Sequence, residues 1–253
     1  MSALEPPRYD PSLDGRRILI TGGGAGIGAA LAETCTRAGA LVGIVGRQQA
    51  RLEQVARLTG AATARADIGI RAEADQAVAS IADQLGGLDG VVNNAAVMLH
   101  SRISAGVAED WKEMLDVNVL GVLHVTYAAL EHLRRADHAD IVNVSSIGAD
   151  RVSMPDYALY SATKAAVVRI TEALREDLAQ DADIRVGVVK PGMVKTGGFG
   201  PGVRDPDLRR QVEATKEKAA MEASVVAAQI CHMIAAPRTA CISELTVIPH
   251  RPH

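Results

Sequence analysis

The chain has 253 residues, of which 48% are hydrophobic and 23% charged, and its formal net charge is -3. This length and apolar content allow a large core, in one α/β domain or two small ones. The slight negative charge excludes the basic field that nucleic acid or an anionic membrane surface would require, so neither is expected as a partner.

The rare residues argue against a metal centre and against export. Cys35, Cys231 and Cys241 form no CxxC pair, and the seven histidines form no HExxH motif, so no metal is expected and the thiols are expected to be buried and reduced. Residues 1–15 hold prolines and charges where a signal peptide has an apolar core, and no apolar run is long enough to cross a membrane. We expect a cytoplasmic protein whose residues 1–15 form a flexible leader.

From Arg16 onward, short apolar segments alternate with longer amphipathic ones. The expected strands cover 17–21, 41–45, 61–66, 88–92, 141–144, 184–189 and 242–248, and the expected helices cover 26–37, 48–58, 71–85, 109–135 and 157–180. Strands separated by helices pair in parallel through right-handed crossovers. The sequence therefore predicts a single α/β domain over 16–253, a doubly wound parallel sheet of about seven strands with helices on both faces.

The first strand runs into a glycine-rich turn that opens a helix. In doubly wound sheets ligands bind outside the carboxyl ends of the strands, and backbone N–H groups in such a turn suit a pyrophosphate. The turn reads either as GxGxxA, through Gly24, Gly26 and Ala29, or as TGxxxGxG, through Thr21, Gly22, Gly26 and Gly28. The second pattern starts directly at the strand end and is preferred, while a tight turn without a ligand is the simpler alternative.

The residues after the second and third strands bear on the choice of cofactor. A dinucleotide site usually has a carboxylate for the ribose hydroxyls after the second strand, where this chain has Gly46 and Arg47. A guanidinium suits a 2′-phosphate, which favours NADP(H) over NAD(H), although Arg47 can also be a solvated residue at a helix start. Asp67 and Ile68 are candidate neighbours of adenine, and a helix N-cap explains Asp67 equally well.

Tyr160 and Lys164 lie one helical turn apart, on one face of the helix expected over 157–180. A fixed positive charge beside a phenol lowers the pKa of the phenol, which makes it a proton donor or acceptor near neutral pH. Taken alone, an exposed pair on a solvated helix is the simpler interpretation. Tyr157 is the competing tyrosine, but the residue four positions after it is Ser161, which is not cationic.

Together these motifs resemble the short-chain dehydrogenase/reductase superfamily, over about Arg16 to Ile248. The resemblance rests on Thr21-Gly22-x-x-x-Gly26-Ile27-Gly28, Asn93-Asn94-Ala95-Ala96, Asn118, Ser146, Tyr160-x-x-x-Lys164 and Pro191-Gly192-x-x-x-Thr196. Three features depart from the family pattern: Ala96 replaces a glycine, Ser146 precedes Tyr160 by fourteen residues, one more than is common, and Arg47 follows the second strand in place of an acidic residue.

The resemblance implies a single-domain Rossmann-type fold and a set of roles. Tyr160 is expected to be the general acid or base, and Lys164 to lower its pKa and hold the nicotinamide ribose. Ser146 is expected to bind the substrate oxygen, with Ser145 pointing to the other side of the strand, and Asn118 to complete a proton relay, unless it only kinks a long helix. The expected cofactor contacts are Gly22, Gly24, Gly26, Ile27, Gly28, Arg47, Asp67, Ile68, Asn94, Ala95, Tyr160, Lys164, Pro191, Gly192, Val194 and Thr196.

The resemblance further implies hydride transfer between NADP(H), or NAD(H), and a small to medium ketone or secondary alcohol. Residues 197–222, which begin with glycines and continue as a charged helical pattern, are expected to form a substrate lid. A homo-oligomer, a tetramer or a dimer, is expected from the same likeness. Two alternatives are an isomerase or dehydratase that retains its nicotinamide and a dinucleotide sensor without catalysis.

Overall fold

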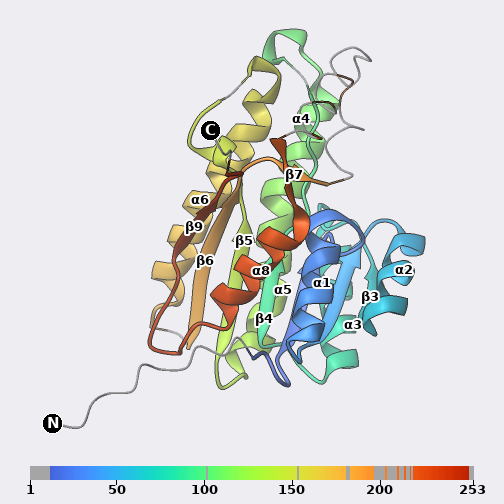
Figure 1. The fold of residues 1–253 in the computed structure, drawn as a ribbon, viewed down its shortest axis with the longest axis vertical. Helices are drawn as coiled ribbons and strands as arrows, with labels where there is room; N and C mark the ends of the chain where they lie inside the picture. Colours follow the sequence, from blue (N-terminus) through green and yellow to red (C-terminus); the bar gives the residue numbers. More distant parts are fainter. Residues whose placement is uncertain are drawn as a thin grey trace, which may run out of the picture.

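The computed structural model describes residues 12–100, 102–152, 154–180, 183–196, 203, 210, 214, 217 and 219–250. A seven-stranded sheet with the order β3-β2-β1-β4-β5-β6-β9 forms its centre, and every neighbouring pair is parallel (Figure 1). The chain runs outward from β1 to one edge, returns through β4 and continues to the other edge. This order places the switch point between β1 and β4, where doubly wound sheets bind their ligands.

The strands of this sheet are β1 (Arg17–Thr21), β2 (Leu41–Gly46), β3 (Ala62–Arg65), β4 (Gly90–Asn93), β5 (Ala139–Val144), β6 (Ile184–Pro191) and β9 (Glu244–Val247). The helices are α1 (Gly26–Arg37), α2 (Gln49–Thr59), α3 (Arg71–Leu85), α4 (Ala108–Leu115), α5 (Gly121–Arg134), α6 (Ala158–Leu178) and α8 (Ala223–Ile234). Two short strands, β7 (Val194–Lys195) and β8 (Met221–Glu222), form a separate small sheet. None of the helices within the described ranges is both long and apolar enough to cross a bilayer.

Alternate residues of the central strands feed two separate cores. Ile18 and Ile20 of β1 pack with α1 and α8, whereas Leu19 between them packs with α3 and α5. Figure 1 looks onto the face covered by α1 and α8. Because successive side chains of a strand point to opposite faces, a buried parallel strand needs an almost continuous apolar run, which is the pattern of the sequence here.

The expected fold class is confirmed, and four local expectations need correction. The helix expected over 109–135 is interrupted by a π-helix, Asp116–Leu120. Helix α8 was not expected, although its apolar residues recur at helical spacing. Leu13 belongs to the core, and its N–H donates to the Ala38 carbonyl at 2.8 Å, so the packed chain begins before residue 16. Cys35 and Cys231 are buried as expected, but Cys241 is exposed.

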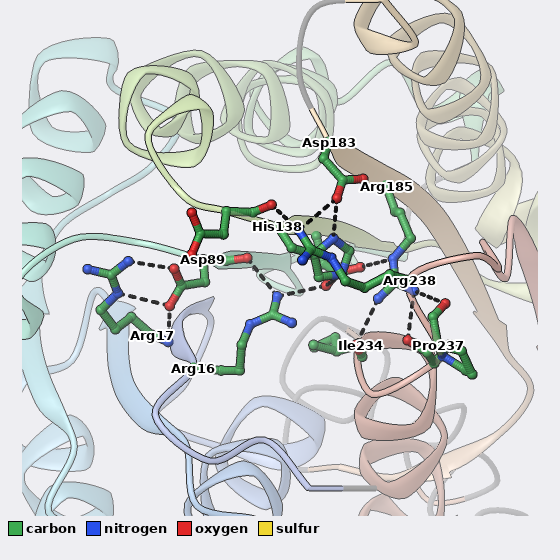
Figure 2. A network of polar contacts seen from close by, with 12 residues as sticks. Arg16, Arg17, Asp89, His138, Asp183, Arg185, Ile234, Pro237 and Arg238 are labelled. Carbon is green, nitrogen blue, oxygen red and sulfur yellow. Dashed lines mark hydrogen bonds and ion pairs between the residues drawn. The ribbon is translucent and has the colours of Figure 1, made fainter. Parts of the chain in front are cut away.

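A network of charged side chains joins the amino ends of the strands, at the edge opposite the switch point (Figure 2). At its centre the Asp140 carboxylate of β5 accepts from Arg16 Nη2 at 2.8 Å and from Arg185 Nε, on β6, at 2.8 Å. Arg185 also donates to the carbonyl of Ile234, the last residue of α8, at 2.9 Å and to that of Pro237, just beyond the helix, at 3.0 Å. One guanidinium therefore ties the sheet to the helix that covers it.

The same network extends to β1 and β4 through a second ion pair. Arg17 Nε donates to Asp89 Oδ2 at 2.8 Å, and Asp89 directly precedes β4. Burial raises the pKa of Asp89, but the hydrogen bonds and charge of Arg17 outweigh burial and lower that pKa overall. His138 lies between Asp140 and Asp183, and burial lowers the pKa of its ring, which favours the neutral imidazole.

Replacement of Asp140 by asparagine is expected to lower the free energy of unfolding by about 3 kcal/mol or more, because two guanidinium groups lose their shared buried carboxylate. The measurement is urea unfolding followed by circular dichroism. Asp75→Asn is the matched control, since Asp75 pairs with Arg71 on an exposed helix face. Such exposed pairs contribute about 0.5 kcal/mol or less. Equal losses in the two variants would contradict a structural role for the network.

Candidate functional site

The glycine-rich turn after β1 has the backbone of an anion cradle. Gly22 and Gly26 have φ angles of +68° and +56°, in the left-handed region that favours glycine. A Cβ on Gly28 would lie 2.2 Å from the Gly22 carbonyl oxygen, so the first turn of α1 packs directly on the loop. The turn ends at the N-terminus of α1, whose unpaired N–H groups suit a pyrophosphate. These residues fit a dinucleotide.

Thr21 and Asn94 hold this turn against the end of β4. The Thr21 hydroxyl accepts from the N–H groups of Asn94 and Ala95, both at 3.0 Å, and Asn94 Nδ2 donates to the Thr21 carbonyl at 2.9 Å. Asn94 is an expected cofactor contact, and in the structure its side-chain amide donates to the backbone of the glycine-rich turn. Asn93 is buried and donates to Thr126 and Asn143. These amides hold the backbone at the ends of β1 and β4, on either side of the switch point.

The residues after β2 and β3 lie together, at what the sequence predicts to be the adenosine end of the site. Arg47 Nη1 lies 2.9 Å from Glu113 Oε1 and 3.7 Å from Asp67 Oδ2. Asp67 is not the N-cap of α3, because the cap is Ile70; its Oδ1 accepts from the Gly69 N–H at 3.0 Å. The alternative reading of Asp67 as a cap is therefore wrong.

Ile68, a predicted neighbour of adenine, has a buried side chain. Its side chain is buried in the core, where a Cβ on Gly121 would lie 2.8 Å from Ile68 Cδ1. Its carbonyl oxygen lies 3.0 Å from His124 Nδ1. The side chain thus packs in the core, and a contact of Ile68 with adenine stays a prediction.

Tyr160 and Ser146 are brought together at the end of β5. Burial raises the pKa of the Tyr160 phenol to about 12, although a hydrogen bond with the Ser146 side chain lowers it in part. Ser146 Oγ also accepts from the Gly148 N–H at 3.0 Å, which fixes the serine in the short turn Ile147–Ala149. The expected lowering of the Tyr160 pKa by Lys164 is not what this structure shows, because desolvation of the phenol dominates.

Lys164 is buried, and a reciprocal pair of hydrogen bonds fastens its helix to β5. Lys164 Nζ donates to the Val144 carbonyl at 2.8 Å, and Ser145 Oγ donates to the Lys164 carbonyl at 2.7 Å. Burial lowers the pKa of the ammonium to about 8. Its nitrogen lies 5.8 Å from the centre of the Tyr160 ring. Ser145 therefore binds the backbone of α6, whereas Ser146 adjoins the Tyr160 phenol.

Asn118 lies in the π-helix and braces two other segments. Its Oδ1 accepts from the Val97 N–H at 2.7 Å, and its Nδ2 donates to the Val97 carbonyl at 2.8 Å and to Thr163 Oγ1 at 3.1 Å. Thr163 Oγ1 donates in turn to the Tyr160 carbonyl at 2.7 Å. Thr163 has no role predicted from the sequence, although it lies inside the Tyr160-x-x-x-Lys164 motif.

The end of β6 approaches the glycine-rich turn. Gly192 N–H donates to the Val247 carbonyl at 2.7 Å after β6 ends at Pro191, and Val194 is buried in β7. A Cβ on Gly26 would lie 3.0 Å from Thr196 Cβ, so the two expected cofactor segments are neighbours. Most of the expected lid, 197–222, falls outside the described residues.

His100 and Arg102 contact the short helix Pro155–Tyr157, which directly precedes α6. The rings of His100 and Tyr157 meet edge to face with their centres 4.4 Å apart, and Arg102 Nε lies 3.0 Å from Asp156 Oδ1. Burial raises the pKa of Tyr157 to about 12, with a further rise from the charge of Asp156. Tyr157 is thus a packing residue against His100, in line with its lack of a cationic partner in the sequence.

The buried ammonium of Lys164 costs the fold stability. Its pKa of about 8 in the folded chain lies below the ordinary value of 10.5, so the unfolded chain binds more protons between these values and stability rises with pH across that window. Lys164→Met is expected to raise the free energy of unfolding at pH 7 by about 1 to 2 kcal/mol and to abolish this rise, since the variant loses one hydrogen bond but no longer buries a charge. Chemical denaturation at several pH values measures both effects, and a less stable variant would contradict the assignment.

Comparisons with known proteins agree with this architecture. Residues 16–205 match the family model described as short chain dehydrogenase. The chain is 32% identical over 233 residues to an uncharacterised oxidoreductase of Staphylococcus epidermidis, a match that covers 91% of this chain and 96% of the relative.

Solved structures give the same result. The fold is similar to the closed form of a serine dehydrogenase complexed with NADP⁺, with a TM-score of 0.84, 27% identity and coverage of 92% of this chain and 94% of that one. It is also similar to a short-chain dehydrogenase from Burkholderia cenocepacia in complex with NADP, with a TM-score of 0.81, 30% identity and coverage of 93% and 97%. With its seven-stranded parallel sheet and its polar groups at the strand ends, the chain belongs to the short-chain dehydrogenase/reductase family of oxidoreductases.

Proposed function

We propose that the protein transfers hydride between NADP(H) and a small to medium ketone or secondary alcohol, with Tyr160 as the general acid and base. The observation that carries the proposal is the buried Lys164, whose ammonium lies 5.8 Å from the centre of the Tyr160 ring, on the same helix face as a tyrosine that Ser146 adjoins. A buried ammonium lowers the stability of the fold, and titratable groups whose pKa is strongly shifted by burial concentrate at functional sites. We further propose a homo-oligomer in the cytoplasm.

The roles follow from the chemistry of each group. A phenol with a pKa of about 12 is protonated at neutral pH, which is the form that donates to the oxygen of a ketone during reduction. Ser146 binds the same oxygen, and Lys164 binds the nicotinamide ribose and balances the charge on the phenolate once the proton has left. Asn118 keeps the π-helix and α6 in register through Thr163. The bound nicotinamide supplies or accepts the hydride.

Cofactor selection is assigned to Arg47. No carboxylate follows β2 before Glu53, and a guanidinium forms charge-assisted bonds with a phosphate. Two of the structurally similar proteins were solved with NADP bound, which supports the same choice.

A panel of carbonyl and alcohol compounds, assayed at about 340 nm with both cofactors, tests the function. Turnover with at least one ketone or secondary alcohol is the expected result. Binding of the nicotinamide without turnover of any compound would favour the sensor instead.

Tyr160→Phe is expected to lower turnover by about 10²-fold or more, because a lost general acid typically contributes 10² to 10⁴. Binding of NADPH, measured by fluorescence titration, should be unchanged. Tyr157→Phe is the matched control, since this tyrosine packs against His100 instead. Near-normal turnover in Tyr160→Phe would overturn the assignment.

Arg47→Ala is expected to weaken NADPH binding by about 1.5 to 3 kcal/mol more than NADH binding, which is the scale of a hydrogen bond to a charged group. Dissociation constants for both cofactors from fluorescence titration give this difference. The same loss for both would show that Arg47 does not recognise the 2′-phosphate.

A further inference from the structure

Glu113 is placed to control the guanidinium that the proposed cofactor needs. It lies on α4, sixty-six positions from Arg47 in the chain, yet its carboxylate accepts a hydrogen bond from Arg47 Nη1 at 2.9 Å. Asp67 Oδ2 is the second acidic neighbour, at 3.7 Å from the same nitrogen. The side chains of Arg47 and Glu113 are 52% and 42% exposed, so the pair is open to an incoming ligand.

The surroundings of the pair are acidic on the side of α4. A cavity of about 330 Å³ lies between α4 and the segment after β3 and is lined by Asp67, Gly69, Ile70, Glu109, Lys112, Glu113, Asp116 and Val117. Lys112 is paired with Asp116 at 2.5 Å. Of these side chains, only Asp67 and Glu113 form ion pairs with Arg47 among the residues that the structure describes.

A carboxylate and a phosphate present the same kind of oxygen acceptor to a guanidinium. We infer that Glu113 determines cofactor specificity, because its carboxylate competes with the 2′-phosphate of NADP(H) for Arg47 and so weakens the preference for that cofactor. This inference rests on the proposed role of Arg47.

The competition affects one cofactor only. A 2′-phosphate that binds Arg47 has to displace the Glu113 carboxylate or remain beside it. If both bind the same guanidinium, the two anions lie close together and repel each other. NADH brings no phosphate to this position and meets no such repulsion. Both Arg47 contacts use Nη1, so the guanidinium can turn its other N–H groups to a phosphate while Glu113 still opposes binding through its charge.

Glu113→Gln tests the inference by equilibrium binding, independently of turnover. We expect the dissociation constant for NADPH to fall about three- to tenfold, and the effect to shrink at high ionic strength because the repulsion is between partly exposed charges. The dissociation constant for NADH should change by less than about twofold, since no phosphate opposes Glu113 in that complex. Fluorescence titration with NADPH and with NADH, at about 0.05 and 0.5 M salt, gives all four values.

Glu109→Gln is the matched control. It removes the same charge one turn earlier on α4, from a residue that lines the same cavity but is exposed. It should leave the ratio of the two dissociation constants unchanged, which separates a specific contact from a general change in charge. In an Arg47→Ala background, Glu113→Gln should no longer tighten NADPH binding.

The outcomes separate this inference from the proposed function. One outcome is that Glu113→Gln leaves NADPH binding unchanged or weakens it, while Arg47→Ala still weakens NADPH binding more than NADH binding. That outcome would overturn this inference and leave the proposed function standing. An equal gain in Glu109→Gln would overturn it as well. A wild-type protein that binds neither dinucleotide would overturn the proposed function, and this inference with it.

Discussion

The docking of α6 on the end of β5 is the contact on which the site depends. The Lys164 ammonium donates a hydrogen bond to the Val144 carbonyl, and the Ser145 hydroxyl donates one to the Lys164 carbonyl. Two buried hydrogen bonds therefore join the end of the strand to the helix. Because this pair fixes the helix in rotation and in height, Tyr160 one turn earlier reaches Ser146 at the strand end. The buried ammonium is costly, and a site that uses it explains why the fold tolerates it.

The amino and carboxyl ends of the strands have different roles in the structure. At the amino ends, Asp140 between Arg16 and Arg185 joins β1, β5, β6 and the end of α8 in one network of ion pairs and hydrogen bonds. At the carboxyl ends, polar residues hold loops: Thr21 and Asn94 brace the glycine-rich turn. The network holds the amino ends of the strands together, so that the carboxyl ends can carry loops, which is where open α/β sheets bind their ligands.

The adenosine end shows how residues from distant elements change the meaning of a motif. An arginine after β2 indicates a phosphate site when it is considered alone. In the structure the same guanidinium already has an acidic partner, Glu113, from α4. Under our proposal, the preference for one nicotinamide cofactor depends on both side chains, since the free energy of binding a phosphate includes the cost of displacing or approaching that carboxylate.

The sequence by itself determined the fold class, a doubly wound parallel sheet, and the residues at the strand ends, because apolar periodicity and glycine spacing are local signals. It also indicated the Tyr160 and Lys164 pair, since i and i+4 share a helix face. Only the tertiary structure decided the direction in which the Tyr160 pKa is shifted, because desolvation depends on everything packed around the phenol and outweighs the hydrogen bond with Ser146. It alone brought Glu113 to Arg47, Thr163 to Asn118 and Arg185 to α8, because these contacts join segments far apart in the chain, whose packing no local pattern specifies.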